Sequence, residues 1–501
     1  MVPILQMRYS TMTISHHSNS STDYVQGNRH SPETQETSER SPFAFKAKSC
    51  YLFIMDVGTL TKVKIDRLAH LGSGVGRVDN RVIFIPFTAP GDTVIARITQ
   101  KKKRFLHGEI QEIVSQSPHR NPSPCDVFGI CGGCHWQHLV YPTQLELKTK
   151  TFRDLLCRIG KIESIEQLPI IPSPREYSYR CRVQLHAEYR GREYALGFFR
   201  ETSHKIIQFQ YCHISDPLIN SVLQGLRPIL NLWVPKPTIQ RIDLNVSVDD
   251  EKVIAILHVS PHFIREGRAI FRNPQSIHQQ LMGVVLVGQG RGRRPVEIGE
   301  TAAKYSWNSP RGITIRYRVG PLSFSQVNSQ QNQRLIHVVL ELAEMRGDEK
   351  VVDLFCGVGN FTFPLSLKAK YAIGIDENPW AIKDAKSIQK LNPIRDLEFF
   401  CMRAQRALQA KPKKILKPDI VVINPPRSGC GQIIKGIVEL GASKIIYISC
   451  DPGTLARDVH NFRMGGYVPV KTQPIDMVPQ TYHIESATLF RRKSQGRYFR
   501  D

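Results

Sequence analysis

The sequence predicts an α/β protein with a small N-terminal β-barrel, a mostly β central domain and a C-terminal doubly wound α/β domain. Two observations lead to this prediction. Short alternating strands separated by glycine-rich turns fill residues 55–116, which is typical of a small barrel. From about residue 326 onwards, buried-type strands alternate with helical stretches, which favours a parallel sheet covered by helices. The expected limits are 1–54 for a tail, 55–116 for the barrel, 117–322 for the central domain and 323–501 for the last domain.

Composition favours a polyanionic partner. The chain has 501 residues, enough for two to four domains, and a formal net charge of +24. Such an excess favours nucleic acid over an anionic membrane surface or a merely solvated basic face. The sequence has neither a run of 18 apolar residues nor a secretory leader, so we expect a cytoplasmic protein without a membrane partner. Its 11 cysteines then favour metal, cluster or catalytic use over disulfides.

The first 54 residues are rich in Ser, Thr, His, Asn and Gln and show little apolar periodicity. Such a segment cannot bury enough surface to offset the cost of ordering, so we expect a disordered tail. A start at Met55 would remove it altogether.

The barrel is predicted from four alternating runs and the turns between them. A glycine-rich turn is expected at residues 71–76 and a second turn at 89–92. A basic segment that ends in an aromatic residue, 101–105, lies between the last two strands. Basic and aromatic side chains on a barrel rim suit RNA, although an ordinary basic hairpin has the same composition. The predicted strands are Val63-Lys64-Ile65, Val82-Ile83-Phe84-Ile85, Val94-Ile95-Ala96-Arg97-Ile98 and Glu109-Ile110-Gln111-Glu112-Ile113.

The central domain is predicted to begin with a Pro-rich linker at 118–124 and a helix at about 140–159. Residues from about 175 to 320 show mainly the pattern of strands and hairpins. A basic, glycine-rich stretch at 288–294 is expected to be an ordinary flexible loop, with RNA contact as the less favoured alternative.

A cysteine cluster stands between the linker and this helix. Cys125, Cys131 and Cys134 have x5 and x2 spacing within one glycine-containing loop, and Cys212 is the expected fourth member. Both zinc and a [4Fe-4S] cluster accept four thiolates, so the residues leave both open. Zinc knuckles usually pair two short spacings, and this loop has one.

A cofactor site is predicted at the start of the last domain. A buried-type strand at 351–355 ends in Cys356-Gly357-Val358-Gly359-Asn360, and a helical stretch follows. A glycine turn at the carboxyl end of a strand lets a ligand approach the backbone closely. The next strand ends in Asp376, where a carboxylate accepts hydrogen bonds from ribose hydroxyls. The pattern favours a methyl-donor cofactor over a nicotinamide cofactor or an unoccupied α/β turn.

A third strand ends in Asn424-Pro425-Pro426-Arg427, in the place that lies over a reactive methyl group in doubly wound sheets. Enzymes that methylate amino groups usually have an aromatic residue where Arg427 stands. Enzymes that methylate carbon 5 of cytosine in RNA have a cysteine where Pro426 stands. The motif therefore argues against both reactions.

A fourth strand, 444–449, ends in Cys450, the sharpest catalytic candidate in the chain. Carbon 5 of uracil is a poor nucleophile, and thiolate addition at carbon 6 activates it. A base must then remove the proton from carbon 5, and Glu485 at the start of the last strand is the best candidate. The alternative is a buried structural cysteine.

Together these residues resemble a known family, the bacterial uridine-C5 RNA methyltransferases, and most closely its 23S ribosomal RNA branch. The resemblance covers about residues 55–501. Its motifs are Phe324-Ser325-Gln326-Val327-Asn328, Asp353-Leu354-Phe355-Cys356-Gly357-Val358-Gly359-Asn360, Asn424-Pro425-Pro426-Arg427, Tyr447-Ile448-Ser449-Cys450-Asp451-Pro452 and His483-Ile484-Glu485.

The resemblance implies a TRAM barrel (OB-like) that binds RNA, a central domain with an iron–sulfur cluster, and a Rossmann-like methyltransferase domain that uses S-adenosylmethionine. It implies a [4Fe-4S] cluster on the four cysteines, with zinc as the alternative, and 23S ribosomal RNA as the partner without an obligate protein partner. It implies Cys450 as nucleophile and Glu485 as proton acceptor. The implied cofactor contacts are Gln326, Phe355, Asn360, Asp376 and Asn424.

Two positions depart from the family's pattern. The family often has Asp at position 424, and it more often has Asn where this chain has Asp451, a carboxylate that would raise the pKa of the thiol beside it. The transfer-RNA branch lacks the cysteine cluster and the barrel, which favours ribosomal RNA, with a tRNA enzyme as an alternative. Two further alternatives are a non-catalytic RNA-binding assembly factor and a radical methyltransferase, although the latter usually has cysteines at x3 and x2 spacing.

Overall fold

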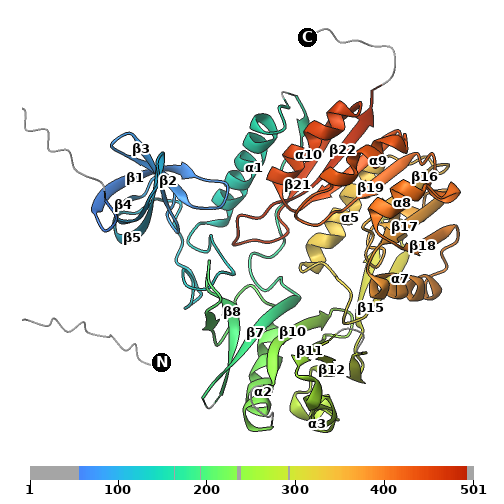
Figure 1. Ribbon diagram of the computed structural model, residues 1–501, viewed down its shortest axis with the longest axis horizontal. Coiled ribbons are helices and arrows are strands. Elements are labelled where there is room, and N and C mark those ends of the chain that lie inside the picture. Colours follow the sequence, from blue (N-terminus) through green and yellow to red (C-terminus); the bar gives the residue numbers. More distant parts are fainter. Residues whose placement is uncertain (1–55, 163, 192, 234–237, 291–293, 494–501) are drawn as a thin grey trace, which may run out of the picture. The chain divides into compact units, whose positions relative to one another are not determined.

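Three larger sheets and one two-stranded hairpin make up the fold (Figure 1). The computed structural model describes residues 56–493 except 163, 192, 234–237 and 291–293. The expected tail at 1–54, the alternative start at Met55 and the centre of the basic loop at 288–294 lie outside the described residues. The α/β fold class is confirmed.

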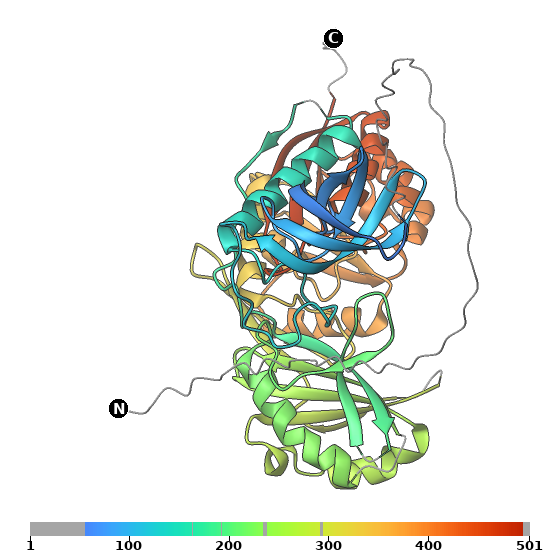
Figure 2. The ribbon, with the colours of Figure 1, turned by 90° about the vertical axis from the view of Figure 1, so that its left-hand side faces the viewer.

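The first sheet is a closed five-stranded barrel in the order β1-β2-β3-β5-β4 (Figure 2). It closes because β4 pairs with β1 as well as with β5. Alternate residues such as Val63, Ile65, Ile83 and Ile98 are fully buried inside it, as the alternating sequence predicts. The strands are β1 (Leu60–Leu68), β2 (Gly74–Val78), β3 (Arg81–Ile85), β4 (Thr93–Lys101) and β5 (Phe105–Ser115).

The second barrel strand corrects the sequence prediction, which placed residues 74–76 in a turn. They form part of β2 instead. Gly74 and Gly76 stand where neighbouring atoms leave no room for a side chain. A Cβ atom on Gly74 would lie 1.8 Å from Thr88 Oγ1, and one on Gly76 would lie 2.4 Å from a methyl group of Val63. Glycine is required here because the backbone passes so close to its neighbours.

The second sheet has seven strands in the order β13-β12-β11-β10-β7-β8-β9. Its pairs are antiparallel except β11 with β12, which run parallel. The strands are β7 (Arg182–Arg190), β8 (Glu193–Phe199), β9 (Ile206–Gln208), β10 (Ile239–Ser247), β11 (Lys252–Val259), β12 (Leu281–Gly288) and β13 (Val296–Gly299).

The helices that pack on this sheet were missed by the prediction of mainly strands and hairpins. The longest, α2 (Pro217–Trp233), buries Ile219, Val222, Leu226 and Leu230, which recur at helical spacing and could have revealed it. Pro228 inside the helix argues against helix from sequence alone. The shorter elements are η1 (Pro261–Phe263), α3 (Ile264–Ile270) and α4 (Pro274–Ile277).

The third sheet has eight strands in the order β18-β17-β16-β19-β20-β22-β21-β6, with β16 to β20 parallel and β22 antiparallel to β20. This order reverses beside β16, as in doubly wound folds. The strands are β6 (Glu166–Gln167), β16 (Lys350–Leu354), β17 (Tyr371–Asp376), β18 (Leu397–Cys401), β19 (Ile420–Ile423), β20 (Lys444–Ser449), β21 (Tyr467–Ile475) and β22 (Glu485–Arg492).

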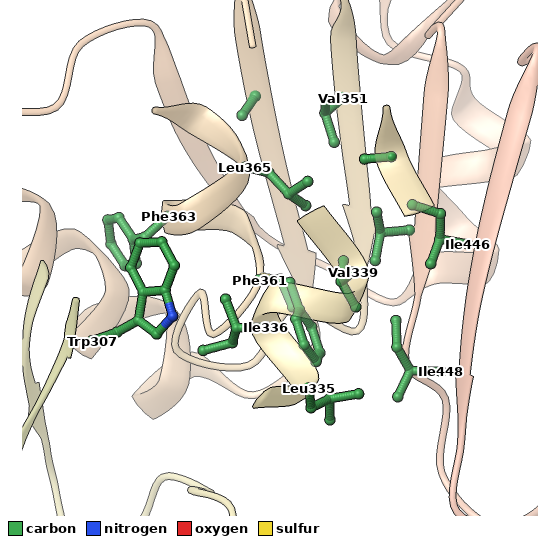
Figure 3. Packing of buried hydrophobic residues seen from close by; sticks show 14 of the residues in the cluster. Trp307, Leu335, Ile336, Val339, Val351, Phe361, Phe363, Leu365, Ile446 and Ile448 are labelled. Atoms are coloured by element: carbon green, nitrogen blue, oxygen red, sulfur yellow. The ribbon is translucent and has the colours of Figure 1, made fainter. Parts of the chain in front are cut away.

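Helices cover both faces of this sheet. Val351 and Ile446 pack with α5, α6 and α7 on one face. Figure 3 shows the part of this packing that α5 and α6 contribute around Phe361. Val352 and Ile445 pack with α1, α8, α9 and α10 on the other. The helices are α1 (Tyr141–Arg158), α5 (Ser329–Ala343), α6 (Thr362–Ser366), α7 (Pro379–Leu391), α8 (Ala404–Ala410), α9 (Ile434–Glu439) and α10 (Pro452–Met464), with short turns η2 (Lys413–Ile415) and η3 (Gly431–Ile433).

The earlier part of the chain contributes to the third sheet. The helix expected at 140–159 is confirmed as α1, which packs against α10, and β6 adds a parallel strand beside β21. The hairpin of β14 (Ala303–Asn308) and β15 (Thr314–Val319) supplies Trp307 and Tyr317 to the core on the α5 face. Among the described helices, none is long and apolar enough to cross a membrane.

Candidate active site

Cys450 and Glu485 lie at the same edge of two neighbouring strands. Cys450 follows the last residue of β20, and Glu485 is the first residue of β22. Ser449 pairs with Ser486 in the antiparallel ladder, and the Ser486 hydroxyl donates to the Ser449 carbonyl at 3.4 Å. The ladder therefore places Cys450 opposite Glu485, with the thiol half-buried and the carboxyl buried.

The protonation of this pair is set by burial and by one arginine. Burial raises the pKa of Cys450 to about 11, and the carboxylate of Glu485 adds to the increase. Burial also raises the pKa of Glu485 to about 8. The Arg427 guanidinium acts against burial in both cases because a positive charge favours the thiolate and the carboxylate.

Arg427 acts electrostatically on both Cys450 and Glu485, and the sequence analysis did not place it beside them. It comes soon after β19, and its Nη2 lies 3.4 Å from His483 Nε2 on the segment that leads into Glu485. The sequence did contain a signal for this position. Arg427 follows a strand of the parallel sheet, and the carboxyl ends of such strands meet at one edge.

Helix α10 ties the loop after β19 to the loop that carries Cys450. The Thr454 hydroxyl donates to the Arg427 carbonyl at 3.0 Å, and Arg457 donates to the Ser428 carbonyl at 2.8 Å. The buried Asp458 accepts from the backbone N–H of Cys430 at 2.8 Å and from the Tyr447 hydroxyl at 2.9 Å. These contacts keep Arg427 beside the thiol.

The cofactor motif forms a strained turn beside a hollow. Phe355 and Gly357 have φ angles of 63° and 56°, in the left-handed region. The carboxylate of Asp376 accepts from the backbone N–H groups of Gly357 and Asn378 at 2.9 and 2.8 Å. Phe355, Asp376 and Pro426 line a hollow of about 520 Å³, within the usual range for a small-molecule site.

The other expected cofactor contacts lie apart from the lining of this hollow. Asn360 and Asn332 exchange two side-chain hydrogen bonds of 2.9 Å, so the Asn360 amide is already engaged. The backbone N–H of Asn424 donates to the Leu354 carbonyl at 3.3 Å, which places Asn424 next to Phe355. Gln326 is half-buried, and its carbonyl accepts from the Cys181 thiol at 3.4 Å.

The segment before Glu485 is held from the barrel side as well. Gly72, in the loop between β1 and β2, accepts from Trp136 Nε1 through its carbonyl at 3.4 Å. A Cβ atom on Gly72 would lie 3.3 Å from the ring of Tyr482. His70 of the same loop is close enough to Asp451 for the carboxylate to raise its pKa, against the larger lowering by burial. The barrel loop therefore borders the edge of the sheet where Cys450 and Glu485 lie, which we call the candidate catalytic edge.

The four predicted cysteines come together. Cys125, Cys131, Cys134 and Cys212 line one cavity of about 90 Å³. Burial raises the pKa of Cys131 to about 11 and that of Cys134 to about 12, and the neighbouring thiols contribute to both increases. In the part of the chain that the structure describes, however, no three His, Cys, Asp or Glu side chains are grouped so that they could hold one metal ion.

Comparison with known families decides the identity of the fold and its chemistry. Residues 140–493, most of the chain, match the family model of the tRNA (uracil-5-)-methyltransferases. The chain belongs to this family. Residues 56–110 match the TRAM domain, which confirms the predicted barrel. As a member of the tRNA (uracil-5-)-methyltransferase family, the protein is an S-adenosylmethionine-dependent RNA methyltransferase.

The similarity of this uracil-5-methyltransferase to its relatives extends over nearly the whole length of those relatives. An uncharacterised RNA methyltransferase of Caldanaerobacter subterraneus is 32% identical over 87% of this chain and 99% of its own. One of Thermosynechococcus vestitus is 31% identical over 86% and 98%. The tRNA (uracil-54, C5)-methyltransferase of Pyrococcus abyssi, solved with S-adenosyl-L-homocysteine, shares the fold with a TM-score of 0.65 and 24% identity, over 86% of this chain and all of that one.

Proposed function

We propose that this enzyme transfers a methyl group to carbon 5 of a uridine in 23S ribosomal RNA through a covalent bond between Cys450 and the uridine. The observation that carries the proposal is the meeting of Cys450 and Glu485 at the edge of β20 and β22, with Arg427 acting on both. The barrel (55–116) and the central region (117–322) hold the RNA, and residues 323–501 carry out the reaction.

The first step is addition of the Cys450 thiolate to carbon 6 of the flipped-out uridine. The new carbon–sulfur bond moves the electrons of the carbon 5–carbon 6 double bond towards carbon 5 and the adjacent carbonyl oxygen. Arg427 stabilises the negative charge at this stage, first on sulfur and then on the ring. S-adenosylmethionine supplies the methyl group that carbon 5 then takes.

Glu485 completes the reaction as the base. Its carboxylate accepts the proton from carbon 5, the double bond forms again, and the bond to sulfur breaks to return the thiolate. Its pKa of about 8 suits a group that takes up a proton and releases it near neutral pH.

The residues around the hollow fit S-adenosylmethionine. Asp376 retains lone pairs to accept from ribose hydroxyls, and the turn from Phe355 to Gly357 leaves its backbone open, since a Cβ on Gly357 would meet nothing within 4 Å. We assign further contacts to Gln326, Asn360 and Asn424. A ligand would have to share the Asn360 amide with Asn332, or displace it.

We assign the cysteine-lined cavity to an iron–sulfur cluster, with zinc as the alternative. A zinc ion with Zn–S bonds of about 2.3 Å needs its four sulfur atoms about 3.8 Å apart. The described side chains offer no group that could hold a single ion, whereas Cys125, Cys131, Cys134 and Cys212 surround one cavity. A [4Fe-4S] cluster would take the four thiolates of this cavity as its ligands. We assign it a structural role, since methyl transfer needs no electron.

A tRNA uridine is the second candidate substrate. The Pyrococcus abyssi neighbour is named for a tRNA position and covers 86% of this chain. Coverage of 86% leaves room for little beyond residues 1–54 and the C-terminal end, so the barrel and the cysteine region do not separate the two RNA substrates. Both RNAs therefore belong in one assay.

The test of the reaction uses purified protein, unmodified 23S RNA, unmodified tRNA and S-adenosylmethionine labelled in its methyl group. We expect label in 5-methyluridine of 23S RNA, with Cys450→Ala abolishing it. Cys157→Ala, which removes an exposed thiol on α1, is the matched control and should keep full activity. Label found only in tRNA would replace 23S RNA by tRNA as the proposed substrate. Label in cytidine would overturn the proposed reaction.

The role of Glu485 is tested by Glu485→Gln. Without the base the methylated adduct cannot release the thiolate, so a covalent protein–RNA species should accumulate and be visible in denaturing gels. The adduct should disappear in the double variant that also carries Cys450→Ala. Loss of RNA binding without an adduct would reject Glu485 as the base.

The cluster is tested by metal and sulfide analysis of protein purified without oxygen. We expect about four iron atoms and four sulfides per chain, lost in Cys131→Ala and kept in Cys157→Ala. One zinc per chain without sulfide would replace the iron–sulfur assignment.

A further inference from the structure

Three arginines form an exposed face on the central sheet. Arg265, Arg268 and Arg272 line a hollow of about 470 Å³ together with Glu297 and Ile298 of β13. All three side chains are exposed. We call this set the arginine face. None of its residues belongs to the candidate catalytic edge, the cofactor hollow or the cysteine cavity.

Helix spacing and close packing put these arginines on one side. Arg265 and Arg268 are three residues apart on α3 and therefore share a helix face. Arg272 follows the end of the helix and lines the same hollow. The opposite side is fixed by Gly267, where a Cβ would lie 2.8 Å from Leu286 of β12 and 2.9 Å from Phe263. The helix therefore lies tightly on the sheet and turns its cations outwards.

These cations are available to a ligand. None of the three arginines takes part in an ion pair with a described carboxylate, whereas Arg318 nearby pairs with Glu300 at 2.9 Å. The carboxylate in the lining, Glu297, accepts from the Thr301 hydroxyl. The other nearby acid is Glu266, which stands between Arg265 and Arg268 on α3 but does not line the hollow. Three guanidinium groups therefore converge on a hollow that is lined by one carboxylate.

We propose that the arginine face binds backbone phosphates of the substrate RNA outside the target loop. The proposal rests on the proposed function in that the bound polyanion is the RNA to be methylated. Guanidinium groups match phosphate oxygens in bidentate geometry, and contacts to phosphates fix the register of the RNA without reading its bases. The arginine face accordingly governs affinity for a long structured RNA and leaves the chemical step unchanged.

The experiment compares two triple variants of the full-length enzyme. Arg265→Gln/Arg268→Gln/Arg272→Gln removes the arginine face. Lys386→Gln/Lys390→Gln/Arg395→Gln is the matched control. It removes three exposed cations from α7 and the loop after it, and none of them forms an ion pair with a described carboxylate. Urea unfolding of both variants establishes that the fold is intact.

The expected result is a loss of affinity for a long 23S RNA fragment of roughly tenfold, with a plot of log affinity against log salt that is shallower by about 2 to 3 in slope. KM for that fragment should rise while kcat stays unchanged. The control triple should change the slope by less than about 1. Equal effects in both triples would show a net-charge effect only and overturn the proposal, as would unchanged binding by the arginine variant.

Two further outcomes separate this proposal from its alternatives and from the proposed function. Loss of binding to anionic vesicles with RNA affinity intact would assign the arginine face to a membrane surface and overturn the RNA assignment. The binding measurement needs no methyl transfer, so failure of the methylation assay leaves it valid. Binding that depends on the arginine face in an enzyme that methylates no uridine would sustain this inference and reject the proposed reaction.

Discussion

Lys148 and Asp476 form an ion pair of 2.6 Å between two side chains that have no exposed surface. Lys148 lies on α1, and Asp476 follows β21, at the start of the segment that ends in Glu485. Burial lowers the pKa of Lys148, and Asp476 acts against that decrease. Lys148 also donates to the Val478 carbonyl at 3.2 Å, and Tyr141 donates to Asp476 at 2.9 Å. The segment before the proposed base is therefore fixed from α1.

Lys148→Met should destabilise the protein strongly. It leaves the Asp476 carboxylate buried with its cation removed, which typically costs about 3 to 5 kcal/mol. The free energy of unfolding in urea measures this cost, and Lys150→Met is the control because Lys150 is exposed on the same helix. The double variant with Asp476→Leu should be more stable than Lys148→Met, since no buried charge remains. A cost under about 1 kcal/mol for Lys148→Met would contradict the prediction.

The raised pKa of Glu485 makes stability depend on pH in a defined direction. The carboxyl has a pKa near 4.5 in the unfolded chain and about 8 in the folded protein, so between these values the folded state binds the extra proton. Stability from this group is therefore present in full below pH 4.5 and is lost as the pH rises through about 8. The slope is at most about 1.4 kcal/mol per pH unit.

Glu485→Gln tests this sign because the amide keeps the shape and cannot ionise. The free energy of unfolding of the wild type should fall relative to the variant between about pH 5 and pH 8. Parallel curves for the two proteins across this range would show that the buried carboxyl has an ordinary pKa. Glu201→Gln, an exposed carboxyl in the turn after β8, serves as control and should leave the wild-type curve unchanged.

Gly72→Ala should loosen the barrel loop from the candidate catalytic edge. Gly72 has a φ of 90°, and an added Cβ would lie 2.9 Å from Trp136 Nε1. Gly58→Ala is the matched control because Gly58 has a φ of 94° and nothing within 4 Å of the added atom. Both variants carry the same backbone strain, of about 1 kcal/mol, and the additional loss in Gly72→Ala measures the contact. Equal unfolding free energies for the two variants would show that the loop accommodates the methyl group.

Much of this arrangement follows from local pattern. Parallel strands with motifs at their carboxyl ends predict an edge where Phe355, Asn424 and Cys450 gather, because sheet topology brings such ends together. The barrel likewise follows from period-two alternation. Pattern fails where a contact distant in sequence decides the outcome. Gly74 was predicted to be a turn residue because nothing in the neighbouring sequence shows that Thr88 packs against it.

The position of Arg427 beside Cys450 and Glu485 could not be predicted for a related reason. Its importance depends on α10, whose Thr454 and Arg457 hold the loop after β19. The same limit applies to Asn360, since the sequence does not show that Asn332 engages its amide. Sequence patterns predict which residues reach an edge, whereas the partners of each side chain depend on packing between elements far apart in the chain.

Asp451 stands where the family more often has Asn, and the effect of this difference on stability and on the pKa of Cys450 can be measured. It caps α10, accepting from the backbone N–H of Thr454 at 2.7 Å. Because Asn caps as well as Asp, Asp451→Asn should leave stability within about 0.5 kcal/mol, whereas Asp451→Ala should cost about 1 kcal/mol.

The carboxylate of Asp451 also adds to the raised pKa of Cys450, so both substitutions should lower that pKa. Alkylation of the Cys450 peptide, followed by mass spectrometry against pH, measures the shift, with the Cys401 peptide of the same digest as internal control. The same alkylation profile in Asp451→Asn as in the wild type would leave the residue with its capping role alone.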